Sequence, residues 1–171
     1  MSAPTADPIL LQIMTAFAAA LAKISLANGF YNDVIAAGVE PLAFNEQDSY
    51  PQIVVQIESS TLSDSKASAC QDTAVLTAHG FLAVAPGSAY STACKLLDDM
   101  TRVVRSITPK TFRVGPEPDL GYVNGNPSLV EKWDFELGRE IVPSEIAEGF
   151  LEVIVRASVT YRDFSPPLVG I

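Results

Sequence analysis

The one histidine of the chain, His79, is the side chain best suited to acid–base chemistry, and it lies in the sequence Thr-Ala-His-Gly-Phe, in the middle of a predicted strand. A histidine acts as a general base when a hydrogen-bonded partner orients it, and the sequence cannot show such a partner. A serine nucleophile would need this same histidine, and the chain contains no Gly-x-Ser-x-Gly motif. We therefore predict that His79 is structural and that the chain has no catalytic residue.

The two cysteines, Cys70 and Cys94, are too far apart in sequence for a Cys-x-x-Cys redox motif or a zinc knuckle. We predict two free, buried thiols in a reducing compartment. The chain has neither the Gly-x-x-x-x-Gly-Lys-Ser/Thr phosphate loop nor a Gly-x-Gly-x-x-Gly motif after a strand. No metal site and no cofactor are predicted.

Carboxylates gather in three places, and none has the spacing of a metal site. Neighbouring residues on a helix point in different directions, so the pair in the second helix cannot converge on one ion. A calcium loop needs alternating oxygen ligands and a closing glutamate, and none is present. We predict that all three groups lie on solvated faces: Asp98 with Asp99, Glu117 with Asp119, and Glu145 with Glu148.

The length and composition of the chain limit the classes of protein to which it can belong. A chain of 171 residues suits one domain, and a net charge of -9 argues against a surface that grips nucleic acid. Charged residues make up 18%, below the usual ~25%. Two explanations remain open: some surface is hidden in contacts between subunits, or the domain is simply apolar.

The first element predicted from the sequence is an apolar helix. Asp7-Pro8 is a helix start, and Asn28-Gly29 supplies the left-handed residue that ends the helix. The run from Ile9 to Leu26 is long enough to raise the question of a membrane span. Lys23 and other polar residues interrupt this run, so a helix in the core is favoured and no membrane partner is predicted.

Strands and one more helix follow. The chain is expected to be extended over 30–44, with a bulge at Gly38, and to form strands over 52–60 and 71–85, a helix over 88–108, and strands over 129–142 and 150–164. On the second helix, Asp98, Asp99, Arg102 and Arg105 fall outside the apolar stripe. In the last strand, the side predicted to face the core holds Leu151, Val153, Val155, Ala157, Val159 and Tyr161.

The predicted fold is α+β, in the order α-β-β-β-α-β-β. A mainly antiparallel sheet of about five strands carries two helices on one face. Residues 1–164 form a single domain with a long loop over 110–128, and residues 165–171 form a tail.

The segment from Leu21-Ala22-Lys23-Ile24 to Asn28-Gly29-Phe30-Tyr31-Asn32-Asp33-Val34 resembles the opening of small tail-terminator and tail-completion proteins of tailed bacteriophages. In that family the first helix often ends in an Asn-Gly-Tyr-type turn, and here Phe30 replaces the tyrosine. A proline-led strand follows, at Tyr50-Pro51-Gln52-Ile53-Val54-Val55, and the last strand, with Tyr161-Arg162, is also similar. The loop over 110–128 has no counterpart.

The resemblance implies a structural virion protein that forms a ring, commonly of six copies. Such a ring caps the tail tube, stops its polymerisation and offers a docking face to the head or neck. The implied partners are other copies, the tail tube protein and the head–tail connector, with DNA as passing cargo, in the virion and, during assembly, in the host cytoplasm. No site residue transfers from the family. The alternatives are another neck, head-completion or sheath-associated protein and, less favoured, a small enzyme or ligand-binding domain that uses His79 and the 110–128 loop.

Overall fold

The computed structural model of the chain describes residues 8–40, 50–61, 70–85, 87–112, 130–145 and 148–163. The α+β class and the predicted order of helices and strands are both confirmed. The elements are α1 (Ile9–Leu21), β1 (Ala36–Gly38), β2 (Gln52–Thr61), β3 (Cys70–Ala83), α2 (Ala89–Ser106), β4 (Val130–Pro143) and β5 (Phe150–Asp163), with short 3-10 helices η1 (Leu26–Asn28) and η2 (Pro109–Phe112).

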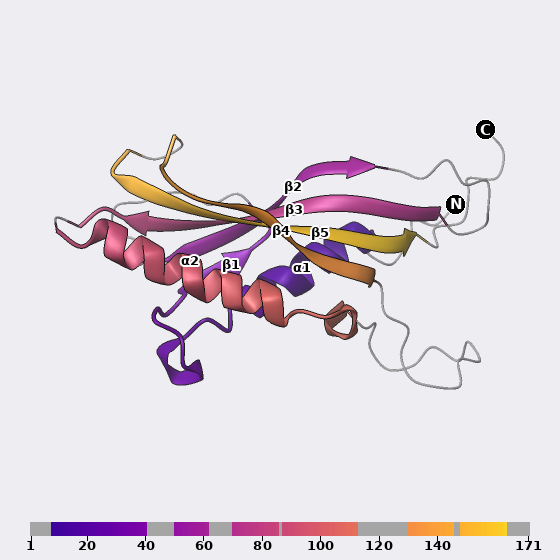
Figure 1. The fold of residues 1–171 in the computed structure, drawn as a ribbon, viewed down its shortest axis with the longest axis horizontal. Coiled ribbons are helices and arrows are strands. Elements are labelled where there is room, and N and C mark those ends of the chain that lie inside the picture. Colours follow the sequence, from indigo (N-terminus) through magenta and orange to yellow (C-terminus); the bar gives the residue numbers. More distant parts are fainter. Residues whose placement is uncertain are drawn as a thin grey trace.

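The five strands form one sheet in the order β1-β2-β3-β5-β4. All neighbouring pairs are antiparallel except β1 and β2, which are parallel. At the centre of the sheet, Ala78 of β3 lies opposite both Val55 of β2 and Val155 of β5. Both α-helices lie on the same side of this sheet (Figure 1).

The side of the sheet that faces the helices, called here the core face, holds one apolar core. The β5 side chains predicted to face the core are all buried there, from Leu151 to Tyr161. Helix α1 contributes Ile13, Phe17 and Leu21 to the same cluster, and α2 contributes Leu96, Met100 and Val104. The alternation of apolar and polar residues in β5 therefore predicted its two faces correctly.

Small residues in β3 let α2 approach the sheet closely. A Cβ added to Gly80 would lie 2.9 Å from Met100 Sδ and 3.0 Å from Leu96 Cδ2. Ala74 and Ala78 lie on the same face and are also buried. Since both contacts come from α2, the glycine sets how near that helix can lie to the sheet.

Trp133 of β4 closes one side of the core. Its ring centroid lies 5.0 Å from those of both Phe17 in α1 and Phe112 in η2. The indole Nε1–H donates a hydrogen bond to the carbonyl of Val104 at 3.1 Å. The start of the predicted 110–128 loop is thus a packed turn as far as Phe112, and residues 113–129 lie outside the described residues.

The first helix is shorter than predicted. It ends at Leu21, and Gly29, with φ of 79°, ends the 3-10 helix η1 instead. Ser25 is fully extended, so the chain turns at this point and brings the buried Ile24 into the core. The prediction of one helix from Asp7-Pro8 to Asn28-Gly29 was therefore wrong, because the packing of Ile24 outweighs the local preference for helix.

Other element predictions need correction as well. Within the described part of 30–44, only Ala36–Gly38 is a strand, and its pairing with β2 is regular, without the bulge predicted at Gly38. Irregularities lie in β2 between Ile57 and Ser59 and in β4 at two places. The strand predicted over 71–85 ends at Ala83, and Val84 beyond its end is 48% exposed. The predicted tail over 165–171 lies outside the described residues.

No helix among the described residues is long and apolar enough to cross a membrane.

Candidate functional site

A buried carboxylate positions the segment that carries the family resemblance. Asp99 of α2 is fully buried. Its two oxygens each accept a hydrogen bond of 3.0 Å from the backbone N–H of Tyr31, and Oδ2 also accepts bonds from the backbone N–H and the side-chain Nδ2 of Asn32. A buried charge with this many donors is well compensated. Asp99 therefore fixes the turn after Gly29 to α2.

Arg102 holds the same turn from the outside. Its guanidinium donates a hydrogen bond of 3.1 Å to the carbonyl of Gly29 and lies 4.8 Å from the ring centroid of Phe30. The guanidinium also lies 3.8 Å from the carboxylate of Asp99, which precedes Arg102 by one turn of α2. The prediction that Asp99 lies on a solvated face is therefore wrong. In the sequence, the burial of Asp99 was indicated by its position next to the apolar stripe of α2, three residues after Leu96.

His79 has the partner that the sequence could not show. On the face of the sheet opposite to the helices, its Nδ1 is hydrogen-bonded to Glu152 Oε1 of β5, and its Nε2 lies 3.0 Å from Thr77 Oγ1. In the neutral imidazole with this arrangement, Nδ1–H donates to the carboxylate and Nε2 accepts the threonine proton. A carboxylate, an imidazole and a hydroxyl in this order are the groups of a general-base relay.

Burial restricts what these groups can do. The Glu152 side chain is 9% exposed and that of His79 is 19% exposed, while Thr77 is buried at 4% exposure. Because the hydroxyl that His79 could activate is closed off from solvent, a substrate cannot reach it in this conformation. In this conformation the three residues therefore hydrogen-bond to one another within the sheet.

A second ionic group crosses the same face of the sheet. Arg156 of β5 donates a hydrogen bond of 2.9 Å to Glu58 of β2 and one of 3.0 Å to Glu140 of β4. Burial would lower the pKa of Arg156, but its hydrogen bonds to Glu58 and Glu140 and the charges of these residues outweigh that effect and raise it. Since arginine is protonated in any case, the contribution of this group is to link three strands.

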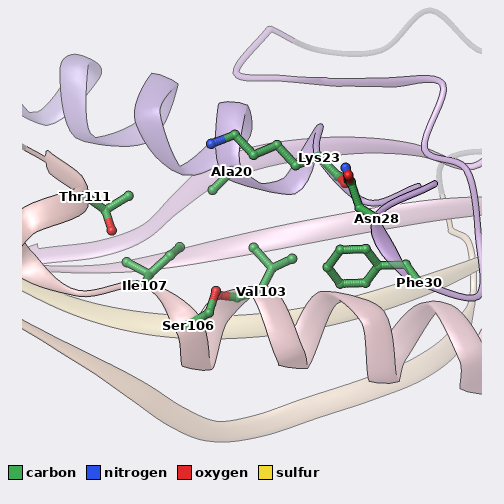
Figure 2. A pocket seen from close by; sticks show the side chains of 8 residues that line it. All are labelled: Ala20, Lys23, Asn28, Phe30, Val103, Ser106, Ile107 and Thr111. Atoms are coloured by element: carbon green, nitrogen blue, oxygen red, sulfur yellow. The ribbon is translucent and has the colours of Figure 1, made fainter. Parts of the chain in front are cut away.

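A cavity of about 390 Å³ lies between the end of α1 and the second half of α2. Figure 2 shows Phe30 and Asn28 at one end, Val103, Ser106 and Ile107 along α2, and Lys23 reaching past Ala20. Three of its polar side chains already hydrogen-bond to the backbone: Asn28 to Lys23, Ser106 to Val103, and Thr111 to Thr108. The cavity thus offers an apolar wall and a lysine, without a set of groups that could carry out a reaction.

A second cavity, of about 510 Å³, lies beside the start of α2, and large apolar side chains are exposed around it. Tyr31 and Ile35 line it and are 58% and 55% exposed. Val84 and Tyr90, next in sequence to the lining residues Ala83, Ala85 and Ala89, are 48% and 63% exposed. We call Tyr31, Ile35, Val84 and Tyr90 the exposed apolar group.

The remaining candidate residues are placed as follows. Asp98, Glu145 and Glu148 are exposed, as predicted, and Glu117 and Asp119 lie outside the described residues. Cys94 is a free thiol but is exposed, which corrects the prediction that it is buried. No side-chain placement is described for Cys70. Among the described residues, no group of three histidine, cysteine, aspartate or glutamate side chains could hold a metal ion.

Comparisons with known proteins add no relationship. No protein-family model matches this chain, and no curated protein sequence matches it.

Proposed function

We propose that this chain is a structural virion protein that forms a ring, expected to be hexameric, on the end of a bacteriophage tail tube. The ring stops polymerisation of the tube and provides the docking surface for the head or neck. Its partners are further copies of itself, the tail tube protein and the head–tail connector, and DNA passes through it as cargo. The family resemblance suggests this role.

The observation that carries the proposal is the exposed apolar group. Its four side chains are each about half exposed or more. Tyr31 and Ile35 line one cavity at the start of α2, and Val84 and Tyr90 are next in sequence to other residues that line it. Large apolar side chains left exposed on one surface mark protein–protein contacts. Tyr31 belongs to the segment of resemblance, and its backbone N–H is fixed by the buried Asp99. A side chain on a fixed backbone loses less entropy on binding, which suits a contact residue.

The test is the molar mass of the purified chain, measured by light scattering over a wide range of concentrations. The wild type is expected to form closed particles of several copies. The double variant Tyr31→Ser/Tyr90→Ser is expected to need at least tenfold more protein to assemble, because two large contact side chains are lost. Ile57→Thr is the matched control, since Ile57 is 43% exposed on β2, outside the exposed apolar group.

Two outcomes count against the proposal. One is a wild type that stays monomeric at the highest concentration, both alone and with tail tubes. The other is a Tyr31→Ser/Tyr90→Ser variant that keeps its fold by circular dichroism and assembles as readily as the wild type.

The hydrogen-bonded series Glu152–His79–Thr77 favours one second candidate, a small enzyme that uses His79 as general base. Its test is turnover of a panel of chromogenic esters and phosphoesters by the wild type and by His79→Gln. Activity that disappears in His79→Gln, with an unchanged melting temperature, would support the enzyme. Absence of turnover in the wild type would remove this candidate.

A further inference from the structure

The exposed charges on the described helices are mostly basic, and those on the opposite face of the sheet are mostly acidic, although the chain as a whole carries a net charge of -9. The helix side is the basic one. Five exposed cations lie on or beside the helices, and we call them the basic helix face: Lys23, Lys95, Arg102, Arg105 and Lys110. On α2 itself, only Asp98 interrupts this stripe among the exposed charges.

The opposite side of the sheet is acidic. Glu140, Glu145 and Glu152 line one hollow of about 660 Å³ at the turn between β4 and β5. Glu58 and Asp134 lie on the same face, further along the strands. Arg156 and Lys132 neutralise part of this charge through ion pairs with Glu58, Glu140 and Asp134. We call the exposed carboxylates of this side the acidic sheet face: Glu58, Asp134, Glu140 and Glu145.

The two faces look in opposite directions. The helices lie on one side of the sheet in Figure 1. Asp134 and Glu140 lie opposite Ser158 and Ile154, which alternate along β5 with residues of the core, so these carboxylates belong to the other side. Their charges are opposite, so each face of one copy is complementary to the other face of a second copy. A contact between two different surfaces is head-to-tail, and repeated contacts of this kind close into a ring when the rotation between copies permits.

We infer that the basic helix face of one copy docks on the acidic sheet face of a neighbouring copy. This inference rests on the proposed ring and adds the surfaces that join its subunits. Charge complementarity across such an interface fixes the register of the copies and speeds their association.

Nucleic acid is the competing partner for a basic surface. Phosphate binding grows with the number of cations that are available to neutralise phosphates. On this surface the guanidiniums of Arg102 and Arg105 already lie over the rings of Phe30 and Phe135. Asp98 also lies within the stripe, so a second copy fits this face better than a phosphate backbone does.

The test is a charge swap, read out as the concentration at which assembly is half complete. Lys95→Glu/Lys110→Glu reverses two exposed charges of the basic helix face, and Glu140→Lys/Glu145→Lys reverses two exposed charges that line the opposite hollow. Each double variant alone is expected to raise that concentration at least tenfold. A chain that carries all four substitutions is expected to return to within about threefold of the wild type, because both faces then have inverted but complementary charge.

The matched control is Glu40→Lys, an exposed charge reversal after the end of β1. It is expected to leave assembly unchanged, which separates local complementarity from the change in net charge. Assembly of the wild type is also expected to weaken at 0.5 M NaCl, since salt screens exposed charges.

The results that overturn the inference differ from those that overturn the ring. If the wild type assembles and the two double variants assemble equally well, the ring stands and these surfaces do not join it. The same holds if the fourfold variant is not restored, or if Lys95→Glu/Lys110→Glu loses only binding to a duplex oligonucleotide. A wild type that never assembles contradicts the proposed ring and, with it, this inference.

Discussion

The two faces of the sheet are stabilised by different kinds of interaction. On the core face, apolar side chains pack against α1 and α2, with the buried Asp99 holding the turn after Gly29. On the opposite face, Arg156, His79 and their glutamate partners link the strands through polar contacts. Stability therefore resides mainly on the core face, where the apolar side chains are buried. The polar face can therefore carry charges whose arrangement serves contacts with other molecules.

The largest effect is expected from a charge placed on the core face. Val155 is fully buried at the centre of β5, so Val155→Asp introduces an unpaired buried carboxylate and should cost about 3–5 kcal/mol of unfolding free energy. Thr160→Asp is the control on the other face of the same strand, opposite Lys132. Urea unfolding of both variants checks the prediction, and equal midpoints would mean that the two faces do not differ as described.

The next effect concerns the two adjacent aspartates of α2. Asp99→Asn turns amide hydrogens toward the N–H groups of Tyr31 or Asn32 and should cost about 2–3 kcal/mol. Asp98→Asn, on the exposed side of the same helix, should change stability by less than about 0.5 kcal/mol. Thermal melting compares the pair. Equal melting temperatures for the two variants would refute the role assigned to Asp99.

A smaller loss is expected where α2 lies against β3. Gly80→Ala forces Met100 or Leu96 to move and should cost about 1–2 kcal/mol. An added Cβ at Gly38 meets no atom within 4 Å, so Gly38→Ala is the control and should leave stability nearly unchanged. Chemical denaturation measures both variants, and a neutral Gly80→Ala would show that α2 has room to shift.

The smallest expected effect is a gain in stability. Thr101 of α2 is buried at 2% exposure, and its hydroxyl has no hydrogen-bond partner among the described residues. Thr101→Val keeps the shape and removes the uncompensated hydroxyl, so it should stabilise the fold by about 0.5–1 kcal/mol. A rise in melting temperature checks this prediction, and a fall would mean that the hydroxyl finds a partner in solution.

Much of the fold follows from patterns along the chain, and the polar contacts do not. The alternation from Leu151 to Tyr161 predicted both faces of β5, and the stripe on α2 predicted its apolar side. The early end of α1 and the irregularities of β4 were missed, because the packing of Ile24 and the pairing with β5 determine them. These contacts join residues far apart in sequence.

The candidate site was predicted least well for the same reason. His79 stood out as the one histidine, but its partner Glu152 lies 73 positions away and meets it only because β3 pairs with β5. Asp99 was expected in solvent, although it receives hydrogen bonds from a turn 67 and 68 positions earlier. No periodic pattern in the sequence predicts these hydrogen bonds between distant residues. The exposure of Tyr31 and Tyr90 likewise depends on which surfaces the other elements leave uncovered.

Whether the chain caps tail tubes can be measured as the length of tubes polymerised with and without the purified chain, read from electron micrographs. We expect that about six copies per tube end shorten the tubes and leave a ring on one end of each. Tubes of unchanged length, with no added density at either end at a large excess of the chain, would contradict this expectation.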